Sequence, residues 1–248
     1  MSSRNIKMIV EYDGGRYDGW TRLGKGESEN TVSNKLVEVL KKMTDEDIEL
    51  FAALRTEKGV HAHCQVVNFK TNVSMKCYEI RNYLNRYLPR DIAVTYVCEV
   101  PERFHSTLNA KSRTYMYRVD TREVANVFDR KYTYYSFDKP DVKAMKEAAE
   151  HIVGTYDFKH LSTAKKNKST VRTVKSIDIY DDGEELTISI KADDFLHNMA
   201  RIIIDILLKA GSGELTPEAV GLIVGGKDHS YEPVPAQAQG LFLENVEY

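Results

Sequence analysis

The chain lacks a hydrophobic run long enough to cross a membrane, so we expect no membrane-spanning helix. It has few cysteines, and the three present, Cys64, Cys77 and Cys98, suit neither a disulfide framework nor a zinc site. It also lacks a glycine-rich phosphate loop and a nucleophile elbow. No apolar signal-peptide segment follows Met1. We therefore expect a cytoplasmic protein with reduced thiols and no association with a membrane.

Histidine content and net charge narrow the function classes further. Of the seven histidines only His61 and His63 are close together, and no helically spaced pair accompanies a carboxylate, so metal catalysis is disfavoured. The formal net charge of −2 argues against non-specific coating of nucleic acid but permits one basic face. At 248 residues, 42% hydrophobic and 29% charged, the chain can form one large or two small globular domains.

The first half of the chain has strand and helix patterns in the order β-α-β-β-α-β. Strands are expected where β-branched and apolar residues cluster, and helices where apolar residues recur with helical period. Asn30 or Thr31 is suited to cap the first helix, and Pro89 ends the second. The second helix should place four residues on one face: Ile80, Tyr83, Leu84 and Tyr87. The expected elements are a strand at 6–12, a helix at 32–43, strands at 47–54 and 65–70, a helix at about 76–87 and a strand at 91–100.

The second half repeats this order, apart from an extra strand and a short helix. Its expected elements are strands at 113–120 and 132–137, a helix after Pro140, a hairpin of 171–180 with 186–191, an apolar helix at 195–210, a short helix from Thr216-Pro217 and a strand at 241–248. The sequence thus predicts an α+β protein with two ferredoxin-like halves, 1–103 and 104–248, that share an antiparallel sheet flanked by helices. This fold hosts many functions, so it does not choose one.

One polar loop, Leu54 to Ala62, stands between two predicted strands. It carries a cation, a hydroxyl, a carboxylate, a glycine and a histidine in succession. Rigid strands that hold such a loop commonly form a functional site. The alternative is a charged hairpin turn in which Gly59 supplies a positive φ.

Basic side chains form three clusters beside predicted loops, and two of these clusters interleave with aromatic residues. Cations beside aromatic rings suit phosphate contacts and base stacking in RNA. The alternative is solvated helix faces and a flexible loop. The predicted RNA contacts are Arg16, Arg22, Lys165, Lys166, Lys168 and Arg172.

The segment Arg55 to Ala62 resembles the tRNA pseudouridine synthase A (TruA) family, which has Arg-Thr-Asp-x-Gly-Val-His-Ala where this chain has Arg-Thr-Glu-Lys-Gly-Val-His-Ala. The similarity runs nearly end to end. Further matching segments are Tyr12 to Trp20, Gln65 to Phe69, Phe104-His105, Ser112 to Tyr117, Asp157-Phe158, Arg172 to Val174, Phe195 to Arg201 and Gly240 to Leu243. Several specific motifs in the family's order identify the chain as a member.

The resemblance implies an enzyme that isomerises uridine to pseudouridine in the tRNA anticodon arm, as a homodimer and without a metal or organic cofactor. It implies that Glu57 stands at the place of the catalytic aspartate, that Arg201 pairs with this carboxylate and that Tyr115 stacks on the target uracil. Arg55 is expected to support the loop, and Leu241 to contribute to substrate binding. Glu57, Tyr115 and Arg201 should therefore converge in one cleft between the halves.

The chain also departs from the family pattern. Glu57 is longer than aspartate by one methylene, on the order of 1.5 Å, and a misplacement of about 1 Å can cost roughly 100-fold in rate. Lys58 replaces a small residue and has the reach to pair with Glu57, while Thr107 replaces an arginine and Asp205 a glycine. Thr21 and Ser33 replace glutamines. These departures leave a second function open, that of a catalytically inactive paralogue that binds RNA.

Overall fold

A computed structural model describes residues 3–21, 28–163, 169–228 and 230–248. Within these ranges the chain forms ten strands and five α-helices. It divides into two compact units, which we call the first unit (Met1–Lys111 with Leu243–Tyr248) and the second unit (Ser112–Phe242). The division into halves at 1–103 and 104–248 stays a prediction.

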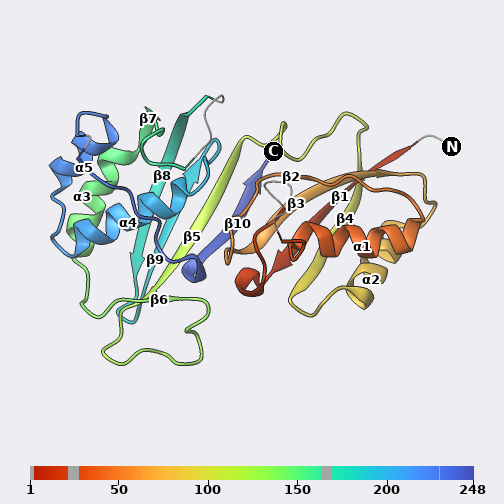
Figure 1. The fold of residues 1–248 in the computed structure, drawn as a ribbon, viewed down its shortest axis with the longest axis horizontal. Coiled ribbons are helices and arrows are strands. Elements are labelled where there is room, and N and C mark those ends of the chain that lie inside the picture. Colours follow the sequence, from red (N-terminus) through yellow and green to blue (C-terminus); the bar gives the residue numbers. More distant parts are fainter. Residues whose placement is uncertain (1–2, 22–27, 164–168, 229) are drawn as a thin grey trace. The chain divides into compact units, whose positions relative to one another are not determined.

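The first unit contains a three-stranded antiparallel core with β1 in the middle. Its elements in chain order are β1 (Arg4–Tyr12), α1 (Val32–Thr44), β2 (Phe51–Ala52), β3 (His61–Thr71), α2 (Cys77–Tyr87) and β4 (Ile92–Val100), with a short 3-10 helix, η1 (Gly14–Arg16), after β1. β1 pairs with β3 on one side and β4 on the other, and β2 pairs with β3. α1 and α2 lie side by side over one face of these strands (Figure 1). This arrangement is the expected ferredoxin-like one.

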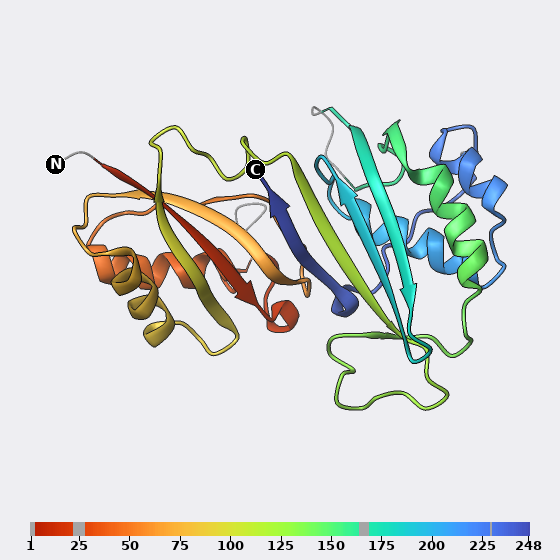
Figure 2. The same ribbon diagram turned by 180° about the vertical axis from the view of Figure 1, so that it is seen from behind.

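The second unit repeats the pattern with additions. Its elements are β5 (Ser112–Asp120), β6 (Tyr134–Tyr135), α3 (Val142–Ile152), β7 (Gly154–Asp157), β8 (Val171–Asp181), β9 (Glu185–Ala192), α4 (Met199–Gly211), α5 (Pro217–Val224) and η2 (Ala238–Gly240). The strand order is β5-β9-β8-β7, all antiparallel, while β6 runs parallel to β5. α3 packs against α4, α5 and β8, as Figure 2 shows from behind. The last strand, β10 (Leu241–Glu247), begins in this unit and ends in the first.

Alternating burial explains why these segments form strands. Every second residue of β1 from Ile6 to Tyr12 is buried, as is every second residue of β9 from Leu186 to Ala192. Thr31 caps α1 by accepting the Asn34 amide at 3.4 Å. The predicted α+β class is confirmed, and the first unit has the β-α-β-β-α-β order. The second half of the chain follows this order once β6, β7 and α5 are set aside, with most of its last strand, β10, in the first unit.

Two predicted strands are far shorter than expected. Regular strand pairing covers Phe51-Ala52 in the segment 47–54 and Tyr134-Tyr135 in the segment 132–137. Each is extended by one backbone hydrogen bond, from Ala53 to Val66 and from Ser136 to Asp120. The apolar residues at 47–54 are apolar because some of them are buried, and burial does not require that they pair in a strand. Ile48, for example, is only 8% exposed, yet it lies outside β2. The four-residue strand β7 was not predicted at all.

Two helix predictions also need correction. The helix expected at 195–210 begins at Met199, because Asn198 adopts a left-handed conformation with φ of +62° and Leu196 forms a turn with Met199. In α2, Tyr87 does not share the buried face with Ile80: it is 54% exposed, and its ring lies 4.6 Å from that of Tyr83.

Candidate active site

The loop 55–60 of the first unit joins β2 to β3 and bends sharply at Glu57-Lys58-Gly59. The Val60 amide donates to the Glu57 carbonyl at 3.2 Å. Gly59 has a φ of +78°, a conformation that costs glycine no steric strain. The Glu57 side chain is half-buried there, whereas Lys58 and Arg55 are exposed. The loop thus presents its carboxylate on a bend whose backbone conformation is fixed locally.

Thr56 anchors this loop to the neighbouring chain. Its Oγ1 lies 2.7 Å from the Tyr12 hydroxyl, and both residues are buried. Its carbonyl accepts the Trp20 amide at 3.0 Å. Just before the loop, Gln65 Nε2 donates to the Leu54 carbonyl at 2.8 Å. Side chain and backbone together therefore hold the residue that precedes Glu57.

Tyr12 lies under the loop as a neutral phenol. Burial raises its pKa far above the usual range, hydrogen bonds with Thr56 and Gln65 oppose this rise, and the negative charge of Glu57 adds to it. Burial is the largest of these effects and the charge of Glu57 the smallest, so it is mainly burial that keeps the Tyr12 hydroxyl protonated.

A glycine-rich segment, 13–20, packs directly against the loop. A Cβ on Gly14 would lie 1.9 Å from the Val60 carbonyl oxygen, and one on Gly19, whose φ is +94°, would lie 2.8 Å from that of Thr56. The Gly14 amide also donates to Nδ1 of the buried His61 at 3.0 Å. His61 thus helps to dock the two segments, and only residues without a side chain permit this approach.

Asp91 holds the middle of the segment 13–20. It accepts hydrogen bonds from the Tyr17 hydroxyl at 2.7 Å and from Arg16 Nε at 3.1 Å. Burial opposes ionisation of the carboxyl, but the bonds from Tyr17 and Arg16 outweigh it and lower the pKa of Asp91. The Arg16 side chain is still 77% exposed, so this pairing leaves part of the guanidinium accessible.

Lys58 interacts with Asp18, its Nζ lying 2.7 Å from Asp18 Oδ1. This bond, together with one from Ser28, lowers the pKa of Asp18. The Lys58 side chain is 79% exposed, and an ion pair so exposed contributes little to stability and is screened by salt. The pairing holds the ammonium group beside the segment 13–20.

Arg201 lies in the first turn of α4, in the second unit, and is held from two directions. Its Nε donates to the Ala236 carbonyl at 2.7 Å, and one terminal nitrogen donates to Asn198 Oδ1 at 3.1 Å. The Ala236 amide in turn donates to the Arg201 carbonyl at 3.1 Å. Asn198 Nδ2 donates to Thr163 Oγ1 at 3.0 Å. The guanidinium is therefore oriented by bonds from both sides.

Two further predicted substrate residues, Tyr115 and Leu241, are buried in the second unit. Tyr115 is 2% exposed, and its ring meets Phe195 edge to face at 5.0 Å; Leu241 is fully buried at the start of β10. A ring so enclosed offers little surface to a base, so the stacking role of Tyr115 stays a prediction.

The predicted RNA contacts in the second unit divide into described and undescribed residues. Arg172 donates to the carbonyls of Ser169 and Val171 and lies 3.6 Å from Asp194, with its side chain only 16% exposed. These contacts engage the two terminal nitrogens within the unit, while Nε is buried without a hydrogen-bond partner among the described residues. Three predicted contacts of this unit, Lys165, Lys166 and Lys168, lie outside the described residues, as does Arg22 of the first unit.

Sequence reasoning missed the residues that hold Arg201. Asn198 carries a signal, because asparagine adopts the left-handed conformation more readily than most residues and here precedes a helix. Thr163 and the Ala236 carbonyl carry none, because they lie far away in sequence and only the fold brings them to Arg201.

In the described ranges, no three histidine, cysteine or acidic side chains gather as a metal ion would require. Among the same residues, no helix combines the length and the apolar character that a bilayer span demands.

Comparisons with known proteins all point to one family. A family model described as "tRNA pseudouridine synthase" matches residues 8–109 and 148–248. A tRNA pseudouridine synthase A 2 of Bacillus cereus is 42% identical over 245 residues, covering 98% of this chain and 99% of the relative. The tRNA pseudouridine synthase A of a Bacillus species has the same identity and coverage. The tRNA pseudouridine synthase A 1 of Clostridium tetani is 39% identical over 246 residues, 99% of this chain and 100% of the relative.

The family model matches well over half of the chain, and the relatives align along almost all of it. The motifs around Glu57 and Arg201 fall within the matched ranges. The chain belongs to the tRNA pseudouridine synthase A (TruA) family.

Proposed function

We propose that this protein is a tRNA pseudouridine synthase, an isomerase that converts uridine to pseudouridine in tRNA. The observation that carries the proposal is the loop 55–60, which presents a carboxylate on a fixed bend in a chain that aligns end to end with enzymes of this name. The reaction breaks the bond between ribose C1′ and uracil N1 and forms one between C1′ and C5. The hydrogen on C5 leaves, and N1 gains one, so the product is an isomer of the substrate.

In this reaction Glu57 acts on the ribose, as nucleophile or as base, while the uracil detaches, rotates and rejoins through carbon. Arg201 is the cation that balances and orients this carboxylate, and Arg55 supports the loop. The family pattern also assigns Tyr115 and Leu241 to the uracil, which requires a change in the packing that encloses them here. The hydrogen bonds of Thr56 support the assignment of Glu57, since they fix the residue beside it. Preorganised geometry of this kind supplies much of an enzyme's rate enhancement.

The target uridine lies in the anticodon arm, and the enzyme acts as a homodimer in the cytoplasm. Arg16 and Arg55 contact phosphates, because both side chains are exposed beside the segment 13–20 and the loop. The alternative, an inactive paralogue that binds RNA, has no support from the relatives, whose names all describe synthases.

The proposal is tested by mapping pseudouridine in tRNA from cells with and without the gene for this protein. Loss of pseudouridine from the anticodon arm, restored by the wild-type gene but not by one encoding Glu57→Ala, is expected. An unchanged map would reject the enzyme and favour the alternative, which binding of the same tRNA would then support.

A further inference from the structure

Asp205 is an acidic residue on the largely apolar helix α4, one turn beyond Arg201. Its side chain is 18% exposed. Oδ2 accepts a hydrogen bond from the Tyr231 hydroxyl at 2.9 Å and lies 2.8 Å from Lys209 Nζ. The same ammonium group lies 5.2 Å from the centre of the Tyr231 ring. Asp205, Lys209 and Tyr231 thus form a closed triangle of contacts, which we call the Asp205 clamp.

The clamp holds a segment that returns to Arg201. Residues 231–237 have no regular secondary structure, but Ala236 exchanges two hydrogen bonds with Arg201, at 2.7 and 3.1 Å. The Gln237 carbonyl accepts from the Tyr117 hydroxyl at 3.0 Å. The segment is therefore attached at its start by Asp205 and at its end by Arg201 and Tyr117.

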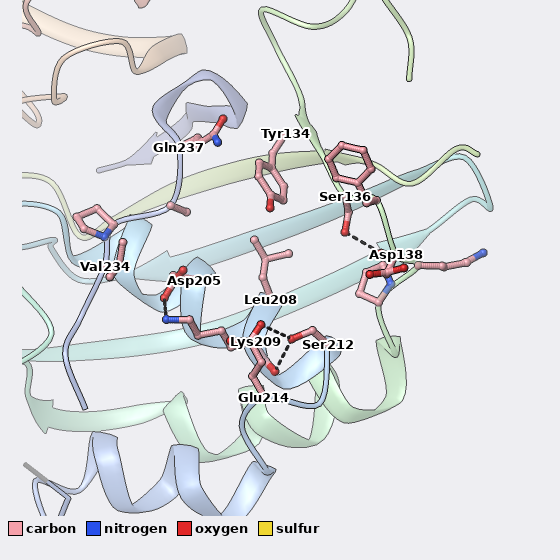
Figure 3. Close-up of a pocket in the computed structure, with 15 residues that line it drawn as sticks. Tyr134, Ser136, Asp138, Asp205, Leu208, Lys209, Ser212, Glu214, Val234 and Gln237 are labelled. Carbon is pink, nitrogen blue, oxygen red and sulfur yellow. Dashed lines mark hydrogen bonds and ion pairs between the residues drawn. The ribbon is translucent and has the colours of Figure 1, made fainter. Parts of the chain in front are cut away.

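Packing alone does not fix this segment. A cavity of about 440 Å³ borders this segment and is lined by Val234 and Gln237 together with Asp205, Leu208 and Tyr134. Figure 3 shows these five side chains. Side chains that border open space lose contacts on that side, so the hydrogen bonds at the ends carry more of the restraint. Loss of one attachment should let the segment move into the cavity.

We propose that Asp205 is a positioning residue for Arg201. Through Tyr231 it keeps the segment 231–236 in place, so that the Ala236 carbonyl orients the Arg201 guanidinium. The proposal rests on the proposed function, in which Arg201 orients the catalytic carboxylate. It assigns Asp205 no contact with the substrate.

The first test reads the position of Arg201 without an activity assay. Exchange of the Arg201 Nε hydrogen with water is followed by NMR on arginine-labelled protein, with the signal assigned by its loss in Arg201→Lys. Asp205→Ala and Tyr231→Phe should accelerate this exchange about tenfold, as expected for loosening a hydrogen bond that involves a charged donor. Tyr231→Phe removes a single hydroxyl, so it stays informative if Asp205→Ala fails to fold.

A matched control comes from α3, where Lys143 and Glu147 form an ion pair with the same i,i+4 spacing, at 3.7 Å and on an exposed surface. Glu147→Ala should leave Arg201 exchange unchanged. If Asp205→Ala and Tyr231→Phe exchange no faster than this control, the proposal is overturned.

The second test separates positioning from general destabilisation. Activity is measured below the melting temperature of the variant. Asp205→Ala should lower kcat about tenfold and leave KM for tRNA unchanged, because the substitution does not alter the residues that bind tRNA. In an Arg201→Ala background the same change should have no further effect, since residues that act as a unit are not additive. A tenfold loss that persists in that background would overturn the proposal. Wild-type protein without activity would instead reject the proposed function, while the exchange measurement still decides whether Asp205 orients Arg201.

Discussion

Gly14→Ala is the sharpest test of how the loop 55–60 is held. The added Cβ would lie 1.9 Å from the Val60 carbonyl oxygen, a backbone atom, whereas real Cβ contacts are essentially never shorter than 3.0 Å. The two segments must therefore separate by at least the difference, 3.0 − 1.9 = 1.1 Å. A displacement of about 1 Å at a catalytic group costs roughly 100-fold in rate. We expect kcat/KM to fall by about this factor and the free energy of unfolding to fall by about 1–3 kcal/mol.

Gly15→Ala is the matched control, because it changes the next residue of the same turn. There the nearest atom to the added Cβ is Asp13 Oδ1, on a side chain, at 3.0 Å. Release of tritium from tRNA labelled at uridine C5 gives kcat/KM, and urea unfolding gives stability. If Gly14→Ala behaves like Gly15→Ala in both measurements, the docking of the two segments does not position the loop.

Three further predictions concern the same unit. Tyr12→Phe removes the hydroxyl that lies 2.7 Å from Thr56 Oγ1 and should destabilise the protein by about 1–3 kcal/mol in urea unfolding; a change below about 0.5 kcal/mol would contradict this role. Asp91 has a lowered pKa in the folded state, so its contribution is present above the unfolded-state value of about 3.9 and is lost as pH falls through the folded value. Wild type should therefore lose more stability than Asp91→Asn as the pH falls from about 5 through the lowered pKa of Asp91. If the two proteins lose stability in parallel over this range, the Asp91 carboxylate does not contribute as described. Arg55→Gln should weaken tRNA binding and reduce the slope of log K against log salt by about one, and an identical slope would place Arg55 away from phosphate.

Strand and helix patterns predicted the fold well where local sequence and burial agree. β1, β9 and α1 follow alternating or helical burial, and capping by Thr31 marked the start of α1. The strand that a segment pairs with can lie far away in sequence. The apolar content of 47–54 therefore could not show that regular pairing with β3 is limited to Phe51 and Ala52. The start of α4 was missed because the left-handed Asn198 interrupts an apolar pattern that runs on from Phe195.

For the candidate site, the sequence indicated the motif residues but not the residues that hold them in place. Glu57 and Arg201 come from motifs, which sequence displays directly. Their supports come from long-range contacts: Asp91 holds Tyr17, and Ala236 holds Arg201. The partner of Lys58 illustrates the point, since the sequence suggested Glu57 next to it, and the structure pairs Lys58 with Asp18 on the packed segment.

The most direct test of the proposed reaction is tritium release from tRNA labelled at uridine C5, measured with wild type, Glu57→Asp and Glu57→Ala. If the loop is built around the longer side chain, wild type releases tritium, Glu57→Asp is equal or slower, and Glu57→Ala is inactive. Wild type no faster than Glu57→Ala, on anticodon-arm substrates and on total cellular RNA, would contradict the account and leave RNA binding as the function.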